Sequence, residues 1–463
     1  MSSIPQVSQA MQSILRTRAQ ALERSTGFVQ RSQVQLDGAI FAQTCVLTWM
    51  QNPNASYSRL RHTAASLGVH VSNQAIEQRF GAASSRLLHA LLEEAVQEVI
   101  SSEARVPELL GRFTGVYLQD GTVLSLPESL AAPWPGSGGK GEQAALRIQA
   151  RVELGSGALS GLWLQEARAA ERSGPAIATP LPRGSLFNAD MGYFTLADMR
   201  ERDKAGQYWT GHAKANLALR DKRGQWWTLL AFLEAQEGSE VDVEVFVGKD
   251  ERLPVRLIAV RVSAEEAARR HERANKQITH PPKGCQAPVP GKRKPKEQRQ
   301  GKPKRKKVSP ARLRLAGWTI VLTNVPQALL TGQEVLVLVR CRWQIELVWK
   351  LWKERGKLDT WRSYKPERIL TEIYAKLLGL LITHWQTVLG CWQAPNRSLV
   401  KAKQVVEWMA PCLALAFVGL AAVEVVVEHT VLMMQTGCTI DSRKKRPNTY
   451  QLLADPKLIQ RFG

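Results

Sequence analysis

Three carboxylates, Asp120, Asp190 and Glu346, stand in contexts that could bring them together. The two aspartates each end a predicted strand, and Glu346 falls inside a predicted helix. Transfer of a phosphodiester by divalent metal needs carboxylates on rigid elements, aimed at one point where two magnesium ions about 4 Å apart activate the nucleophile and stabilise the leaving oxygen. Two strand ends and a helix packed over the sheet would meet this need.

Each aspartate taken alone has a plain structural alternative. Asp120 and Gly121 form a dipeptide that is favoured in hairpin turns. Asp190 could cap the helix that follows it. Neither aspartate predicts catalysis without its context.

Glu346 is more informative because of its basic neighbours. Spacings of four, four, three and four positions place five charged residues on one helical face: Arg342, Glu346, Lys350, Lys353 and Lys357. A salt-bridged surface face is the alternative, and it would contribute only about 0.2–0.5 kcal/mol per pair. One acid among several bases better fits a metal ligand flanked by groups that hold phosphate.

Chain length, composition and net charge indicate the general class of protein. The 463 residues suffice for about three structural units, and 44% hydrophobic with 22% charged residues is typical of a globular protein. The 63 Lys and Arg exceed the 41 Asp and Glu, for a formal charge of +22. This excess predicts a polyanionic partner. RNA-binding proteins share it, so charge alone indicates no reaction.

The cysteines and the apolar segments favour a cytoplasmic protein. The six cysteines include no CxxC pair and no Cys/His cluster at zinc-ligand spacing, and Met1 to Arg16 lacks the apolar core of a signal peptide. The uncharged stretch from Trp408 to Val423 has 16 residues, short of the ~20 that a spanning helix needs. We expect a buried bundle helix there and no membrane partner.

The first hundred residues predict helices, clearest at 11–22, 40–50 and 87–100. Within them, 60–68 and 73–80 resemble a helix-turn-helix, in which the small Ala64 and Ala65 allow close crossing, Gly68 permits the turn and Ser72 caps the second helix. The second helix would offer four residues to a major groove: Asn73, Gln74, Gln78 and Arg79. A helical hairpin that reads no DNA is the alternative.

Strands begin after Gly115. Alternating residues predict strands at 116–120, 122–126 and 146–154, which suggests a meander, and a short strand at 185–189 leads into Asp190. A second β-rich piece runs from 208 to 262, followed by a short helix at 264–276. A last strand is predicted at 318–323, and the remainder reads as helical over 332–356, 367–392 and 399–434.

A low-complexity basic segment separates the β-rich piece from the last strand. Residues 283–314 carry 13 basic residues and one acidic residue, so just over half of the net charge lies in one stretch. We expect it to be disordered in isolation. A solvated linker is one interpretation, and contact with phosphates is the other.

The segment Arg342-Trp-Gln-Ile-Glu346, with Lys353 seven residues later, resembles part of the Tyr-x(2)-Arg-x(3)-Glu-x(6)-Lys signature of DDE transposases in insertion-sequence family four. The blocks around Asp120, Asp190 and Trp318 resemble other blocks of that family in the same order. The similarity covers about 60–386, most of the chain.

The resemblance implies an α/β fold with a ribonuclease-H-like catalytic core interrupted by a β-rich insertion, a helical N-terminal DNA-binding region and C-terminal helices. It divides the chain into a DNA-binding region (1–110, helix-turn-helix at about 59–82), a first core part (111–205), the insertion (206–276), a basic flexible linker (277–314), a second core part with the Glu helix (315–395) and a C-terminal helical region (396–463).

The resemblance also implies the roles of the site residues. Asp120, Asp190 and Glu346 would bind two Mg²⁺ ions, with Mn²⁺ as a substitute, and four residues would contact DNA: Arg342, Lys350, Lys353 and, by stacking on an extruded base, Trp318. For Trp318 a place in the core is the alternative. The signature Tyr is replaced by Val339, so its phosphate contact is missing or supplied elsewhere.

These observations predict a bacterial, nucleoid-associated transposase that cuts transposon ends and joins them to target DNA, acting on double-stranded DNA as a homodimer in a synaptic complex. The dimer is implied by the resemblance only. A catalytically impaired or domesticated relative of the same fold is one alternative, and Val339 is its support. A helix-turn-helix regulator with structural carboxylates is the other.

Overall fold

The fold is taken from a computed structural model, in which the chain forms two compact units. Unit 1 comprises Met1–Val106, Gly121–Ala169 and Gln344–Lys445, and unit 2 comprises Pro107–Asp120, Ala170–Trp343 and Arg446–Gly463. The structure describes residues 3–31, 34–102, 107–138, 143–248, 252–279, 309–392, 394, 396–440 and 447–461. Most of the predicted basic linker, 280–308, lies outside the described residues.

Unit 1 is mainly helical. Its helices are α1 (Ile4–Gln12), the π-helical η1 (Ser13–Arg18), α2 (Ala19–Ser25), α3 (Gly38–Gln51), α4 (Tyr57–Ser66), α5 (Asn73–Gln78), α6 (Ala82–Ala95), the short η2 (Glu128–Leu130), α14 (Trp343–Glu354, apart from its first residue), α15 (Pro366–Cys391), α16 (Leu399–Phe417) and α17 (Val423–Gly437). The predicted helices at 11–22, 40–50 and 87–100 correspond to helices here, although α6 already ends at Ala95.

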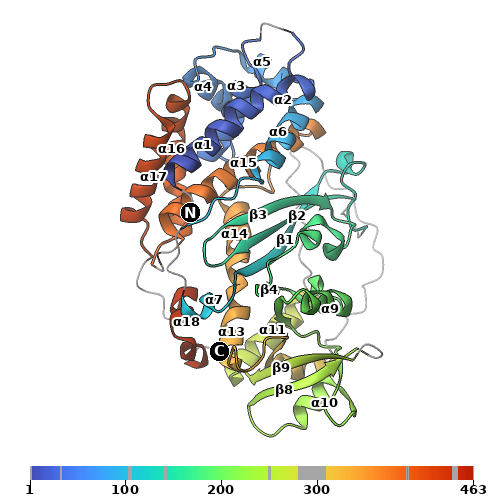
Figure 1. Ribbon diagram of the computed structural model, residues 1–463. Coiled ribbons are helices and arrows are strands. Elements are labelled where there is room, and N and C mark those ends of the chain that lie inside the picture. The colour runs from blue at the N-terminus through green and yellow to red at the C-terminus, as the bar shows by residue number, and fades with distance from the viewer. Residues whose placement is uncertain are drawn as a thin grey trace. The chain divides into compact units, whose positions relative to one another are not determined.

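The centre of unit 1 is α15, which is buried along nearly its whole length. A helix that is apolar on all sides belongs inside a bundle, and α15 packs against α3, α6 and α17. Figure 1 shows the orange-red α16 and α17 beside the blue α1. The helical reading of 367–392 is therefore confirmed, with a shift of one residue at each end.

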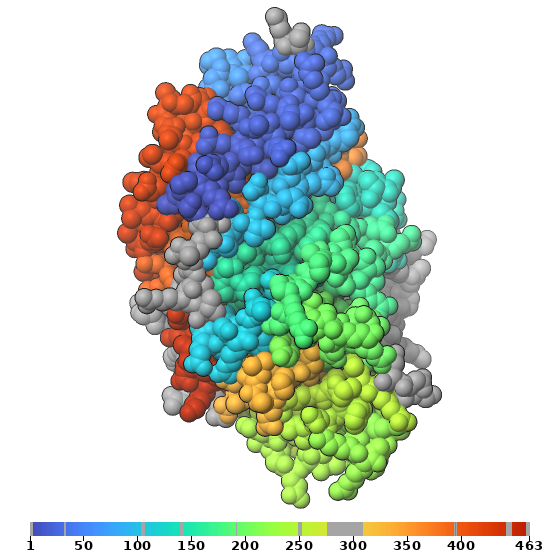
Figure 2. Space-filling view, viewed as in Figure 1, coloured from blue at the N-terminus to red at the C-terminus, as the bar shows by residue number. Residues whose placement is uncertain are grey.

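The predicted helix at 399–434 is two helices, α16 and α17, separated by 418–422. Gly419 there has φ +85°, a left-handed conformation that ends a helix readily. Among the described residues, no helix is long and apolar enough to cross a membrane. Figure 2 shows the surface of α16 and α17 in orange-red. The two helices expose apolar side chains, including Trp408 on α16 and Leu432 on α17.

The strands of unit 1 follow the order β3-β2-β1, with β2 (Ala144–Glu153) antiparallel to β3 (Leu159–Glu166). The β2–β3 turn is anchored to α15, because the buried His384 Nε2 donates to the Gly157 carbonyl at 2.9 Å. Gly157 has φ +73°, and a Cβ there would lie 2.6 Å from the Trp392 ring. This turn therefore requires glycine.

β1 (Val116–Leu126) is one continuous strand. The predicted break between 116–120 and 122–126 is wrong, and so is the alternative of a hairpin turn at Asp120 and Gly121. The predicted meander is corrected accordingly: its members are β1, β2 and the strand β3, which the sequence analysis did not find.

Unit 2 contains the other strands and shorter helices. Its strands after β1 are β4 (Leu186–Ala189), β5 (Tyr208–His212), β6 (Ala218–Arg220), β7 (Trp226–Thr228), β8 (Glu240–Val247), β9 (Leu253–Arg261) and β10 (Trp318–Thr323). Its helices are α7 (Glu108–Gly111), η3 (Glu171–Ser173), α8 (Pro175–Ala178), η4 (Met191–Tyr193), α9 (Leu196–Lys204), α10 (Leu229–Glu234), α11 (Ala264–Thr279), α12 (Pro310–Ala316), α13 (Gly332–Cys341), α18 (Thr449–Ala454) and η5 (Pro456–Arg461).

The strand order in unit 2 is β1-β4-β5-β10-β9-β8-β6-β7. β4 is parallel to both β1 and β5, whereas β10 is antiparallel to β5 and β9. β5 thus lies between β4 and β10 within the sheet, although the sequence analysis placed it at the start of a separate β-rich piece. This mixed α/β arrangement is consistent with a ribonuclease-H-like core.

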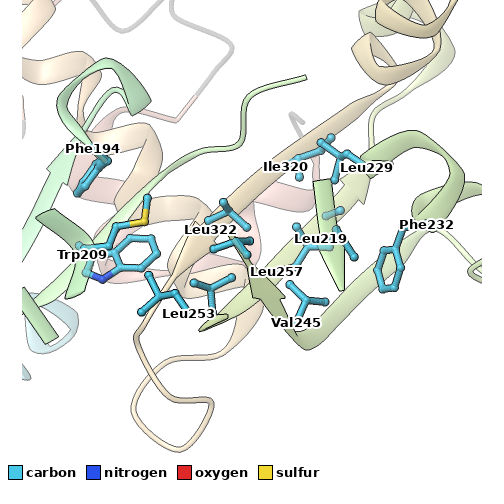
Figure 3. Close-up of a cluster of buried hydrophobic side chains, with 14 of the residues drawn as sticks. Phe194, Trp209, Leu219, Leu229, Phe232, Val245, Leu253, Leu257, Ile320 and Leu322 are labelled. Carbon is cyan, nitrogen blue, oxygen red and sulfur yellow. The ribbon is translucent and has the colours of Figure 1, made fainter. Parts of the chain in front are cut away.

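The core of unit 2 lies on β5 and its antiparallel neighbours. Figure 3 shows Trp209 from β5, Leu322 from β10 and Leu257 from β9 gathered in one apolar cluster, continued by Leu219 and Val245. The β-rich character predicted for 208–262 is confirmed, and on β8 Val241, Val245 and Val247 are buried on one face. Burial of this apolar face holds the strands in register.

Two predicted helical boundaries of unit 2 are also corrected. The helix at 332–356 is interrupted at Arg342, which caps α13 before α14 begins at Trp343. α11 continues to Thr279 and α12 begins at Pro310, so both enter the stretch assigned to the linker.

One buried ion pair ties two strands of unit 2 to the segment after β10. Arg256 on β9 donates to both carboxylate oxygens of Asp242 on β8 at 2.7 Å. Its remaining nitrogen donates to the carbonyls of Val325 and Leu330 at 3.2 and 2.7 Å. The Arg256 side chain is only 6% exposed and the Asp242 side chain is 27% exposed. The Val325 and Leu330 residues are buried, so their carbonyls have no ready replacement for the guanidinium.

We predict that Arg256→Met lowers the free energy of unfolding by about 1–3 kcal/mol, because it leaves two buried carbonyls without a donor and a partly exposed carboxylate without its cation. Urea denaturation measures the change. Lys222→Met is the matched control: Lys222 and Glu244 also pair, at 2.8 Å, but both are exposed, and such pairs contribute about 0–1 kcal/mol. Equal effects of the two substitutions would contradict the prediction.

A pH dependence follows from His384. Burial lowers the pKa of this imidazole to about 4, against about 6.5 in an unfolded chain. A base whose pKa is depressed by folding stabilises the protein fully above pH 6.5 and loses that contribution as the pH falls toward 4. Between pH 7 and 4.5, we expect the free energy of unfolding of the wild-type protein to fall by about 2 kcal/mol more than that of His384→Gln. Urea titrations of both proteins at these pH values test this, and parallel losses would contradict it.

Candidate active site

Three polar residues form a row across neighbouring parallel strands of unit 2, at the ends of β4 and β5 and beside the middle of the longer β1. The prediction that Asp120 ends a strand is therefore wrong. On β1 and β4, Gln119 pairs with Ala189, so Asp120 and Asp190 are each one residue further along neighbouring strands. Neighbouring strands lie about 4.8 Å apart. Asp120 is half-buried and Asp190 is exposed. The structure thus brings the two predicted aspartates together at the carboxyl end of β4, the usual edge for sites in sheets of this kind.

His212 extends this row and was missed by the sequence analysis, which gave the histidines no role. Asn188 on β4 pairs with Thr210 on β5, so Asp190 and His212 each lie two residues beyond paired positions. Partial desolvation, the Arg342 guanidinium and the Arg270 guanidinium lower the pKa of His212, and the Asp190 carboxylate and a backbone hydrogen bond oppose the shift. No sequence pattern marks this histidine, because its place follows from strand pairing alone.

Arg342 is brought to the same row by α13. Asn188 is buried two residues before Asp190, and its side-chain amide donates to the Leu338 carbonyl at 2.5 Å. Leu338 lies one helical turn before Arg342. The fields of Arg342 and Asp190 both act on His212. The predicted phosphate-binding arginine and the second aspartate therefore share one corner of unit 2.

The first α-helix of more than four residues after Asp190 is capped by another residue. The next longer helix, α9, is capped by Thr195, whose hydroxyl accepts from the Asp198 amide at 3.1 Å. Asp190 precedes the short turn η4, where its carbonyl accepts from the Tyr193 amide.

Glu346 is half-buried in the first turn of α14. Seven residues later, Lys353 donates to the Val123 carbonyl of β1 at 3.1 Å, so α14 runs beside the unit 1 part of that strand (Figure 1). Lys350 is exposed and lies 3.9 Å from Glu354. Lys357 is beyond the end of α14 and has φ +46°. The predicted charged face is therefore wrong at Lys357, and Arg342 is a cap of α13 rather than part of α14.

The predicted helix-turn-helix corresponds to α4 and α5. The Ser72 hydroxyl accepts from the Ala75 amide at 3.0 Å, and Gly68 has φ +80°, so the cap and the turn are as expected. Ala64 is buried, but Ala65 is exposed and takes no part in the crossing. The second helix is shorter than predicted and ends at Gln78.

The four predicted groove residues differ in their surroundings. Asn73, Gln74 and Gln78 are exposed on α5. Arg79 is half-buried, donates to the Leu36 carbonyl at 2.8 Å and lies 3.9 Å from the Phe28 ring centroid. Burial lowers the pKa of this guanidinium. Arg79 is thus engaged within unit 1, and a role in reading DNA stays a prediction.

Trp318 and Val339 are both buried in unit 2. Trp318 begins β10 as predicted, is 6% exposed and has the Arg261 guanidinium 4.6 Å from its ring centroid. Val339 is 4% exposed on α13. Trp318 as described belongs to the core, and stacking on a base stays a prediction.

The donor set of the row fits a hard cation in kind. Magnesium and manganese prefer carboxylate oxygens, and Asp120 and Asp190 supply them from adjacent strands. Within the described part of the chain, no group of three or more His, Cys, Asp or Glu residues is arranged to hold a metal ion. The structure therefore provides a pair of carboxylates, Asp120 and Asp190. That Glu346 joins them as a third metal ligand stays a prediction.

Known proteins place this site in a family. The family described as Transposase DDE domain matches residues 111–382, more than half of the chain and the whole stretch from Asp120 to Glu346. The chain is 25% identical over 385 residues to the transposase for insertion sequence element IS231E of Bacillus thuringiensis subsp. finitimus, covering 78% of this chain and 75% of the relative.

Other transposases are similar over shorter stretches. The transposase for insertion sequence element IS1151 of Clostridium perfringens is 21% identical over 333 residues, 67% of this chain and 65% of that protein. The putative transposase InsL for insertion sequence element IS186A of Escherichia coli (strain K12) is 36% identical over 70 residues, 15% of this chain and 19% of that protein. The chain belongs to the family of transposases with a DDE domain.

Proposed function

We propose that this transposase is a metal-dependent, cut-and-paste enzyme that nicks DNA at transposon ends and joins the new 3′ hydroxyl to target DNA. The adjacent positions of Asp120 and Asp190 on parallel strands carry the proposal. Two carboxylates at one sheet edge are what a metal-dependent phosphodiester transfer requires of a fold. The proposal places the reaction in the bacterial cytoplasm, on nucleoid DNA, in a homodimer that pairs two ends.

The metal ligands in this proposal are Asp120, Asp190 and Glu346. Bound Mg²⁺, or Mn²⁺ in its place, would lower the pKa of a water nucleophile and stabilise the leaving oxygen. Asp120 and Asp190 come from unit 2 and Glu346 from unit 1. Glu346 follows Arg342 by four residues in the chain, and it enters the proposal through its place in the Arg342–Lys353 signature segment.

The basic residues around Glu346 hold the DNA backbone in this proposal. Arg342 offers a planar fork that matches a phosphate, and Lys350 offers an exposed ammonium. Lys353 holds α14 to β1 through the Val123 carbonyl, and its ammonium is the second basic group of the signature segment that we assign to a phosphate. Recognition of the end sequence falls to α5, where Asn73, Gln74 and Gln78 are exposed.

A catalytically impaired relative is the second candidate, because Val339 replaces the signature tyrosine. The buried Val339 side chain offers no hydroxyl to a phosphate. Impairment would lower the rate without altering the fold, so a cleavage assay separates the two candidates. A helix-turn-helix regulator would bind the same DNA and cut none.

We predict that Asp120→Ala, Asp190→Ala and Glu346→Ala each lower magnesium-dependent nicking at least about 10²- to 10³-fold while DNA binding is retained, because each removes one ligand of the catalytic metals. An oligonucleotide duplex carrying the inverted repeat that brackets the gene is the substrate. Glu428→Gln, which neutralises an exposed carboxylate on α17, is the control and should nick normally. Undiminished nicking by Glu346→Gln would remove Glu346 from the triad.

The basic segment yields a separate prediction on binding. Replacing Lys304, Arg305, Lys306 and Lys307 by Gln should reduce the slope of log Kd against log salt concentration by about 0.9 for each phosphate contact that is lost, because fewer counterions are released. Fluorescence anisotropy at several salt concentrations measures the slope. An unchanged slope would show that the segment is a plain linker.

A further inference from the structure

Three charged residues of α15 form a buried ladder in unit 1. Arg368, Glu372 and Lys376 are 3%, 1% and 3% exposed and follow one another at intervals of four residues. Glu372 lies 2.9 Å from the Lys376 ammonium and 3.9 Å from Nε of Arg368. The ladder is thus a row of three charged side chains in the interior of unit 1, with a cation at each end and the carboxylate between them.

The Arg368 end of the ladder meets the helix-turn-helix. Its guanidinium carbon lies 3.7 Å from the ring centroid of Phe80, which follows α5, and 4.3 Å from that of Tyr57, which begins α4. The ring of Trp49 on α3 lies 5.4 Å away. Cation–π contacts are strongest when the guanidinium is desolvated, as it is here. The arginine therefore fixes both ends of the α4–α5 pair.

The Lys376 end of the ladder holds the segment that follows α14. Its ammonium donates to the carbonyls of Lys357 and Thr360 at 3.0 and 2.7 Å. Lys357 adopts φ +46°, which is uncommon for a residue with a side chain. A buried donor that bridges two carbonyls holds such a turn in place. Lys376 therefore holds the turn that directly follows α14.

Surface contacts link the same two parts of unit 1. Arg362 donates to the Asn54 carbonyl, before α4, at 3.0 Å, and Lys365 lies 3.2 Å from Glu77 on α5. These contacts are partly or fully exposed, so they contribute little energy. The buried ladder is the stiffer connection between the α4–α5 pair and α14.

The energetics argue for a positioning role. Removing charges from water is costly, and a buried ion pair seldom stabilises a fold more than apolar residues of the same size would. Among the described residues, Nε of Arg368 and both carboxylate oxygens of Glu372 have no hydrogen-bond partner, so the ladder is not explained by the stability it adds. What it supplies is a specific arrangement of the segments that it contacts. In unit 1 that arrangement relates the helices that would bind DNA to the helix that carries Glu346 and Lys353.

We propose that Arg368, Glu372 and Lys376 are positioning residues, which hold α14 in a fixed relation to α4 and α5 so that DNA bound by the helix-turn-helix is presented correctly to Glu346. This inference rests on the proposed function. It assigns the ladder no contact with DNA or with metal.

The test neutralises Glu372 and Lys376 together, so that neither is left as a buried charge without the other. The double variant Glu372→Gln/Lys376→Met neutralises both partners. Lys403→Met is the matched control, because Lys403 is also buried in unit 1 and pairs with Glu407 on its own helix. For each protein we would measure the thermal unfolding midpoint, the Kd for the inverted-repeat duplex and the single-turnover rate of nicking at saturating DNA with Mg²⁺.

We expect the double variant to stay folded and to keep its Kd while its nicking rate falls at least about tenfold, because small displacements at a reaction site are costly. Lys403→Met should nick at the wild-type rate. Lys376→Arg, which keeps the charge and the donors, should recover part of the lost rate. Wild-type nicking by the double variant would overturn the proposal, and so would a rate loss matched by Lys403→Met.

A second readout separates this proposal from the proposed function. Hydrogen exchange of the α14 amides should be faster in the double variant than in the wild type or Lys403→Met, with or without DNA. If the wild-type protein nicks no duplex, the proposed function fails. Hydrogen exchange of the α14 amides then remains as the test of the positioning role. Unchanged exchange in α14 would then overturn the positioning role.

Discussion

The parallel pairing of β1, β4 and β5 is the constraint on which the candidate site depends. Pairing of Gln119 with Ala189 and of Asn188 with Thr210 leaves no freedom in where Asp120, Asp190 and His212 fall. A slip of one residue in a strand would turn every side chain to the other face. The apolar core on β5, β9 and β10 opposes such a slip, so burial far from the aspartates fixes their spacing.

The interruption at Arg342 is the second structural condition of the site. α13 is anchored to β4 by the bond from Asn188 to the Leu338 carbonyl, and α14 is anchored to β1 by the bond from Lys353 to the Val123 carbonyl. The end of α13 at Arg342 brings this residue into the environment of Asp190 and His212 in unit 2.

Helices and strands could be predicted from sequence where one long, unbroken run of apolar residues marks the element. The strand at 318–323 and the helix α15 were found nearly to the residue, because their apolar runs are unbroken. β3 was missed because a bulge opposite 149–151 and the left-handed Gly161 destroy its alternation. The turn preference of Asp120 and Gly121 was overridden by pairing along β1, which is a tertiary effect. His212 has no local signal, since strand register alone places it in the row.

The buried ladder on α15 illustrates why sequence reading stops short of such devices. Charges four residues apart usually indicate a solvated helix face, and Arg368, Glu372 and Lys376 would be interpreted that way from spacing alone. The structure shows them nearly inaccessible to water, with three aromatic rings at one end and two backbone carbonyls at the other. Those partners come from α3, α4, the residue after α5 and the segment after α14, which are far apart in the chain. A network that is costly to bury and joins such distant segments is better explained by the geometry it enforces than by the stability it adds.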